Sequence, residues 1–92
     1  MRNRTRFEII SSILETANRY NGATRTKIMY GAFLSHSRMK EYLTILTNNG
    51  LLSYDLDTRT FTITDKGHKF LQVYNGINSK MGEEDEEHYL RM

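Results

Sequence analysis

The chain has 92 residues and no cysteine, and 26% of its residues are charged. This length suits one small domain with a modest core, and the missing cysteines exclude disulfides and thiolate metal sites. No apolar run approaches the ~20 residues needed to cross a membrane, and the first residues, MRNRTRFE, lack the apolar segment of a signal peptide. We therefore expect a soluble cytoplasmic protein without a membrane partner.

The net charge of +2 hides an asymmetry along the chain. Of the 13 Lys and Arg residues 12 precede Gly82, whereas only 6 of the 11 Asp and Glu residues do. Residues 1–81 therefore carry +6 and residues 82–92 carry −4. A basic body favours a polyanion partner, because neutralising phosphates releases counterions. Ordinary surface charge that keeps the protein soluble is the alternative.

Residues 5–20 place apolar side chains at the spacing of one wide helical stripe. Asn21 and Gly22 should end this first helix, because both residue types tolerate the left-handed conformation that follows a helix. Ala23 and Thr24 are expected to be extended and to form a very short strand.

A short second helix is predicted over residues 25–31, with Thr24 as its N-cap. Gly31 and Ala32 are expected to permit the sharp turn that follows this helix. The apolar side chains of the helix should face inward, and these are Ile28 and Met29.

The third predicted helix covers residues 36–48 and begins after the N-cap Ser35. The run Asn48-Asn49-Gly50 is a strong stop signal at its end. Apolar side chains recur along the helix at helical spacing and should face the core. These are Met39, Tyr42, Leu43 and Leu46.

A β-hairpin is predicted after the third helix. Residues 51–54 and 60–64 have the character of two strands, and the second alternates strictly between apolar and polar side chains. Residues 56–59 lie between them as the loop. A pair of helices followed by a hairpin can place one helix in a DNA major groove and a loop beside it.

Thr64 is placed to cap a fourth helix that begins at Asp65. Apolar residues then repeat as a narrow seam of the coiled-coil kind, which Gly76 interrupts. The charge cluster in residues 82–92 indicates a disordered, solvated tail. We expect the seam to form a dimer interface, and its residues are Phe70, Tyr74, Ile77 and Met81.

Four short motifs, taken in order, carry a resemblance to a known family. The motifs are Ile28-Met29-Tyr30, Tyr42-Leu43-x-x-Leu46, Asn49-Gly50-Leu51-Leu52 and Thr64-Asp65-Lys66-Gly67-His68-Lys69-Phe70-Leu71. With them the chain resembles winged helix-turn-helix proteins, and more narrowly the small archaeal winged-helix DNA-binding proteins, which include chromatin-associated dimers and transcription regulators. The last motif matches a threonine-x-x-glycine pattern that such proteins carry after the wing.

The resemblance implies an α+β fold, with a three-helix core, a two-stranded wing and a C-terminal helix that pairs two subunits. Residues 1–64 would form the DNA-binding domain with a basic N-terminal arm, residues 65–81 the dimerisation helix, and residues 82–92 the acidic tail. Relatives often carry a longer, uninterrupted C-terminal helix in an antiparallel coiled coil. Gly76 and Gly82 depart from that pattern.

The polar side of the third helix is the main candidate for DNA contact. Two cations and two hydroxyls at helical spacing can bond phosphates, and an arginine can also bind guanine. Glu41 can accept from a cytosine amine or pair with Arg38 or Arg25, and His36 would lie near phosphates. A solvated polar face without a partner is the alternative. The cations and hydroxyls are those of Ser37, Arg38, Lys40 and Thr44.

Other basic residues can extend this contact. Arg59 at the hairpin tip can enter a narrow minor groove, although Asp55 and Asp57 lower the positive potential there. Arg25 and Lys27, at the start of the second helix, can hold a phosphate. A basic arm could also lie over the DNA backbone, and its members are Arg2, Arg4 and Arg6.

No motif in the sequence indicates catalysis. The three histidines are far apart and have no ligand partners at metal-binding spacing, so neither a metal nor another cofactor is expected, and no small-molecule ligand is evident. We therefore expect a homodimer that binds double-stranded DNA as a transcription regulator or nucleoid-associated protein. A winged-helix protein–protein interaction module is the alternative.

Overall fold

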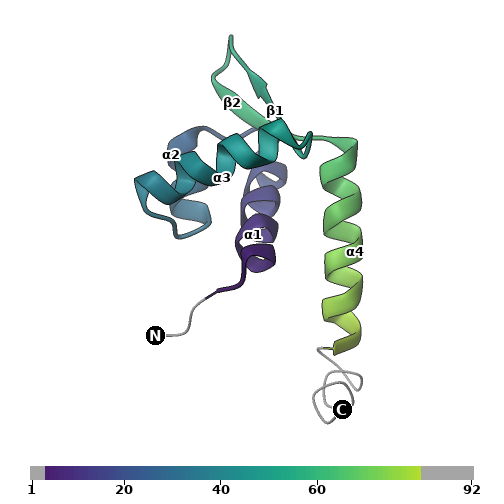
Figure 1. The fold of residues 1–92 in the computed structure, drawn as a ribbon. Coiled ribbons are helices and arrows are strands. Elements are labelled where there is room, and N and C mark those ends of the chain that lie inside the picture. Colours follow the sequence, from purple (N-terminus) through teal and green to yellow (C-terminus); the bar gives the residue numbers. More distant parts are fainter. Residues whose placement is uncertain (1–3, 82–92) are drawn as a thin grey trace.

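The computed structural model describes residues 4–81, and the side chains among them up to residue 76. Within that part of the chain, three helices are followed by a two-stranded antiparallel hairpin and a fourth helix (Figure 1). The predicted α+β fold and the order of its elements are therefore confirmed. The elements are α1 (Arg6–Arg19), α2 (Arg25–Gly31), α3 (His36–Asn48), β1 (Leu52–Asp55), β2 (Thr60–Ile63) and α4 (Asp65–Met81).

Side-chain caps explain where the first three helices begin. Thr5 and Glu8 form a capping box at α1, in which each side chain accepts a hydrogen bond from the backbone N–H of the other residue. The hydroxyls of Thr24 and Ser35 accept from backbone N–H groups in the first turns of α2 and α3. Each cap satisfies one donor that the helix itself leaves without an acceptor.

The β-hairpin, called the wing below, is joined to the start of α2 by a single bridge. Tyr54 pairs with Phe61 across β1 and β2. The backbone N–H of Ala23 donates to the carbonyl of Phe61 at 2.9 Å, and the N–H of Phe61 donates to the carbonyl of Ala23 at 2.8 Å. The very short strand predicted at Ala23 is thus confirmed as one pair of hydrogen bonds.

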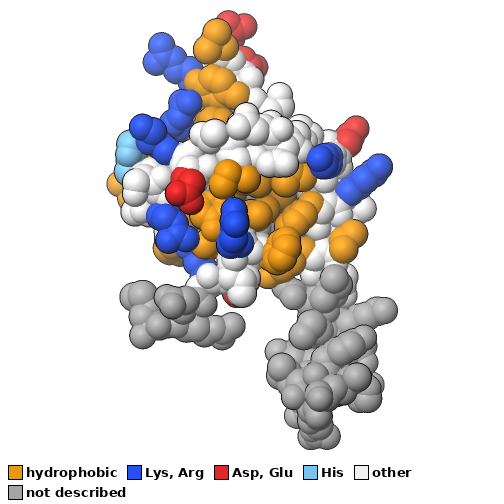
Figure 2. All heavy atoms as spheres, in the orientation of Figure 1, with side chains coloured by type: hydrophobic (Ala, Val, Ile, Leu, Met, Phe, Trp, Pro, Cys, Tyr) orange, Lys and Arg blue, Asp and Glu red, His pale blue; other side chains and the backbone are white. Residues whose placement is uncertain are grey.

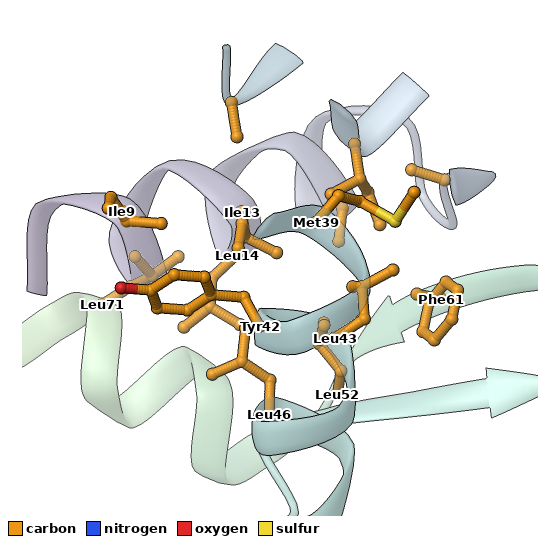
Figure 3. Packing of buried hydrophobic residues seen from close by; sticks show 14 residues of the cluster. Ile9, Ile13, Leu14, Met39, Tyr42, Leu43, Leu46, Leu52, Phe61 and Leu71 are labelled. Carbon is orange, nitrogen blue, oxygen red and sulfur yellow. The ribbon is translucent and has the colours of Figure 1, made fainter. Parts of the chain in front are cut away.

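The core lies where α1, α2 and α3 meet beneath the wing. Figure 3 shows Tyr42, Leu43 and Leu46 of α3 pointing toward α1, the wing and α4, with Ile13 and Leu14 of α1 facing them. All four α3 residues predicted to face inward are buried. Phe61 of the wing and Leu71 of α4 complete the cluster, so the core holds both elements against the three helices.

The prediction that Gly31 and Ala32 permit the sharp turn after α2 is right for Ala32, which is the C-cap residue, and wrong for Gly31. Gly31 is the last residue of the helix, and the left-handed conformation belongs to Phe33, whose φ is +55°. A Cβ atom on Gly31 would lie 2.6 Å from the Cγ2 atom of Thr16. Glycine is therefore needed here because α2 approaches buried Thr16 of α1 too closely for any side chain.

The threonine-x-x-glycine pattern fixes the start of α4 against the end of α3. The Thr64 hydroxyl donates to the carbonyl of Gly50 (2.6 Å) and accepts from the N–H of Gly67 (3.0 Å). A Cβ atom on Gly67 would collide with the carbonyl oxygen of Leu51. One hydroxyl and one missing side chain thus set where α4 leaves the wing.

Gly76 does not end α4, which continues as a helix to Met81. The helical backbone is therefore continuous through the glycine that was predicted to interrupt the seam. The side chains of Ile77 and Met81 lie outside the described residues, as do Arg2 of the basic arm, Gly82 and the acidic tail.

Candidate nucleic-acid interface

The side of α3 that faces away from the core carries exposed polar residues. Ser37, Glu41 and Thr44 occupy its middle, and all three are exposed. Because successive residues of a helix are about 100° apart, Arg38 and Lys40 point in directions that differ by roughly 160°. The two cations therefore lie on opposite edges of the polar side rather than next to each other.

Contacts made by the two cations confirm this separation. The guanidinium carbon of Arg38 lies 5.7 Å from the ring centroid of Tyr42. Lys40 instead lines a groove between α3 and the wing. In the space-filling view, Lys and Arg side chains gather on the left, over the wing and the ends of α2 and α3 (Figure 2).

The groove between α3 and the wing combines cations and hydroxyls. Arg25 and Lys40 contribute the positive charges, and no Asp or Glu occurs among the described residues that line the groove. The hydroxyls of Thr44, Thr47 and Thr64 donate to backbone carbonyls. The two cations and the hydroxyls of Ser53 and Tyr54 are therefore the groups that suit an anion, because they can donate to its oxygens. The hydroxyl-bearing residues of the lining are Thr44, Thr47, Ser53, Tyr54 and Thr64.

Arg25 is held in this groove by the aromatic pair at the base of the wing. Its guanidinium carbon lies 5.0 Å from the ring centroid of Tyr54 and 5.2 Å from that of Phe61. One guanidinium nitrogen also lies 3.4 Å from the Tyr54 hydroxyl. These contacts join the start of α2 to the wing and fix the position of one cation.

Tyr54 is the aromatic residue of this site that the sequence did not predict. Its partner Phe61 was expected only as an apolar residue of the alternating second strand. Their direct opposition in the hairpin, which the strand pattern implied, was the available signal. The contact with Arg25 carried no such signal, because Arg25 and Tyr54 are 29 positions apart.

The other predicted contact residues do not join the groove. Lys27 turns away from it, and its Nζ atom lies 4.6 Å from the ring centroid of Tyr20. His36 is exposed at the first turn of α3. Arg59 is exposed at the wing tip with a φ of +58°, away from the residues that line the groove. Of the basic arm, Arg4 donates to the carbonyl of Phe33 at 3.1 Å.

Two acidic residues, Asp55 and Glu41, lie near the site. The Asp55 carboxylate accepts hydrogen bonds from the backbone N–H groups of Asp57 and Thr58, so it shapes the wing turn. Within residues 4–81, Glu41 forms no ion pair with Arg38 or Arg25, whose guanidinium groups lie over aromatic rings. Of the two alternatives for Glu41, the ion pair with Arg38 or Arg25 is therefore not formed in the described part of the chain.

A second exposed surface, of apolar character, lies along α1 and α4. Phe7 stacks on Phe70 with ring centroids 6.1 Å apart, and Phe70 stacks on Tyr74 at 6.2 Å. Phe7 is 61% exposed and Val73 is 64% exposed. Hydrophobic side chains gather in the centre of the view in Figure 2 and to the right of it, over these helices. We call Phe7, Phe70, Val73 and Tyr74 the aromatic strip.

In the described part of the chain, no group of His, Asp or Glu side chains is arranged so that it could hold a metal ion. None of the described helices is both long enough and apolar enough to span a membrane.

Three helices, a two-stranded wing beside the third, and a polar α3 surface define a winged helix-turn-helix protein. The family model described as winged helix-turn-helix matches residues 3–82, so the chain belongs to this family. Its fold is similar to the crystal structure of Sso10a-2, a DNA-binding protein from Sulfolobus solfataricus. The TM-score is 0.72, with 21% sequence identity and 97% of each chain covered. No curated protein matches the sequence.

Proposed function

We propose that this protein binds double-stranded DNA through α3 and acts in transcription regulation or nucleoid organisation. The observation that carries the proposal is the groove between α3 and the wing, which presents Arg25 and Lys40 without a carboxylate. A phosphate strand running through it would meet two cations and the hydroxyls of Ser53 and Tyr54. The winged helix-turn-helix fold and its similarity to a DNA-binding protein support the same partner.

The two edges of α3 would then face the two different phosphate strands that border the major groove. The major groove is about 12 Å wide and admits one helix between its two phosphate strands. Lys40 and Arg38, on opposite edges of the polar side, would each face one strand. Ser37, Glu41 and Thr44 lie between them and would face the base edges, where Glu41 can accept from a cytosine amine.

Reversing the charge at both edges of α3 tests the proposal. Arg38→Glu with Lys40→Glu should weaken duplex binding at least 100-fold, because two phosphate contacts become repulsions. Both residues are exposed, so the melting temperature should change little. Fluorescence anisotropy with a labelled duplex measures the affinity, and circular dichroism measures the fold.

Lys69→Glu is the matched control, because Lys69 is an exposed cation on α4. It reverses one charge away from the groove, half the change in charge of the double variant, and should have a much smaller effect on duplex binding. If the double variant still binds the duplex with wild-type affinity, α3 does not contact DNA. The protein-interaction module would then be the better explanation of this surface.

We propose further that two copies of the chain pair through the aromatic strip. Phe7 and Val73 leave most of their surface in water in the single chain, and burying such area is favourable at about 25 cal/mol per Å². A two-fold pair would present two α3 helices to half-sites about one helical turn or more apart.

Sedimentation velocity tests this pairing. Phe7→Glu with Val73→Glu places charges on the strip without changing a buried residue, so a dimer should become a monomer. The control is Asn75→Glu, at an exposed position of α4 about 160° around the helix from Val73, which should sediment like the wild type. A wild-type protein that is monomeric at high concentration would contradict the pairing.

A further inference from the structure

Phe33 has a backbone conformation that does not suit it. It lies in the turn between α2 and α3 with a φ of +55°. This is the left-handed region, in which the Cβ atom of an L-residue crowds the following carbonyl group. Glycine occupies such positions at no steric cost, and for a bulky residue the conformation is a true outlier.

The side chain of Phe33 gives no packing in exchange for this strain. It is 84% exposed, whereas the next residue, Leu34, is partly buried against the core. Tyr30, one helical turn earlier, is 70% exposed. A strained backbone that displays a large apolar ring to solvent is typical of a residue kept for an interaction.

The surroundings of Phe33 identify the chemistry of its partner. Residues 16–40 contain five Lys and Arg residues and no Asp or Glu. The Arg4 guanidinium donates to the Phe33 carbonyl at 3.1 Å, which adds a cation beside the turn. Ser35, two residues later, caps α3. An apolar ring beside a cation, at the amino end of the helix proposed to contact DNA, suits that partner, because DNA offers apolar groups between its phosphates.

We propose that Phe33 is an apolar DNA contact whose ring packs on the 5-methyl groups of thymine in the major groove, beyond the first turn of α3. This inference rests on the proposed function, because it needs α3 to enter that groove. The 5-methyl group of thymine is the apolar feature that the major groove displays, and phenylalanine is one of the side chains that can contact it. Phe33 therefore selects for thymine near the amino end of α3.

A pair of duplexes isolates this contact. One is a short alternating A·T duplex, and the other has the same sequence with uracil in place of thymine, so that only the methyl groups differ. The wild type should bind the thymine duplex about fourfold more tightly, the factor expected for burying one methyl group. Phe33→Ala and Phe33→Gly should bind both duplexes equally.

The two variants also separate the ring from the strain. Phe33→Ala removes the ring but keeps a Cβ atom in the left-handed conformation, so the backbone strain remains. Phe33→Gly removes both the ring and the strain. The melting temperature of Phe33→Gly should therefore exceed that of Phe33→Ala by about 4 °C. A glycine variant that is at least as stable as the wild type, yet no longer distinguishes thymine from uracil, is the expected signature.

Several results would overturn the inference. These are equal binding of both duplexes by the wild type, unchanged discrimination in either variant, or a glycine variant less stable than the alanine variant. A loss of self-association in Phe33→Gly with discrimination intact would assign the ring to a protein contact and also overturn it. If the wild type binds neither duplex, the proposed function itself fails, which is a separate outcome.

Discussion

Helices α3 and α4 both lie with one side in the core, but their uncovered sides differ in chemistry. On α3 the exposed side carries hydroxyls and charges, such as Ser37, Lys40 and Thr44. On α4 the exposed residues include polar ones such as Lys69 and Gln72, but the uncovered side also carries Val73 and part of the rings of Phe70 and Tyr74. Exposed polar groups are well solvated and need no partner. Burying exposed apolar area against a partner, in contrast, is favourable. The two helices therefore suit two different partners, a polyanion for α3 and an apolar surface for α4.

Salt should separate the two surfaces most strongly. Raising monovalent salt from ~50 to ~200 mM should weaken duplex binding about 100-fold, because about four cations would release counterions. Association through the aromatic strip should weaken little over the same range, since it depends on apolar burial. Anisotropy and sedimentation measured in the same buffers test the contrast. Equal salt dependence of the two equilibria would contradict it.

The attachment of α4 should be sensitive to a single methyl group. Gly67→Ala should lower the free energy of unfolding by about 2 kcal/mol, because its Cβ atom collides with the rigid carbonyl of Leu51 and overpacks the side chain of Ile63. Urea unfolding followed by circular dichroism measures the loss. An unchanged unfolding midpoint would mean that α4 can move away without cost.

On the α3 side, the base of the wing should matter more than its tip. Arg25→Met should weaken duplex binding about tenfold, through the loss of one charge-assisted phosphate contact. Arg59→Met should change it less than about twofold, since Asp55 and Asp57 oppose the charge at the tip. Anisotropy at one fixed salt concentration compares the two variants. The reverse ranking would place DNA at the wing tip.

The smallest effect is expected within α4. Gly76→Ala should stabilise the helix by up to about 1 kcal/mol, because nothing lies within 4 Å of the added Cβ atom. If α4 pairs two subunits, the same change should tighten their association. Thermal unfolding and sedimentation equilibrium measure both effects. A lower melting temperature would show that the glycine has a packing role in the paired form.

The order of elements could be predicted from the sequence because it depends on local signals. Helical spacing of apolar residues, the caps Thr24, Ser35 and Thr64, and the alternating residues 60–64 each act within a few positions. The candidate contact residues of α3 could be predicted for the same reason, since the exposed side follows from the helical period.

What could not be predicted depends on contacts between distant residues. The requirement for glycine at Gly31 depends on Thr16, which blocks a side chain there only once α1 and α2 have packed. The sequence alone therefore suggested a turn. The position of Arg25 over the Tyr54 ring likewise requires the folded wing. No local pattern announces that Phe33, rather than a glycine, carries the positive φ. Such features belong to tertiary structure and are accessible only when the chain is seen folded.

The bridge between Ala23 and Phe61 affects how tightly a ligand can bind. Two backbone hydrogen bonds hold the wing to the entrance of α2 before any partner arrives. The surface that would face DNA is then pre-organised, and binding it loses little conformational entropy. Hydrogen exchange at the Ala23 and Phe61 amides should therefore be nearly as slow in the free protein as in the complex.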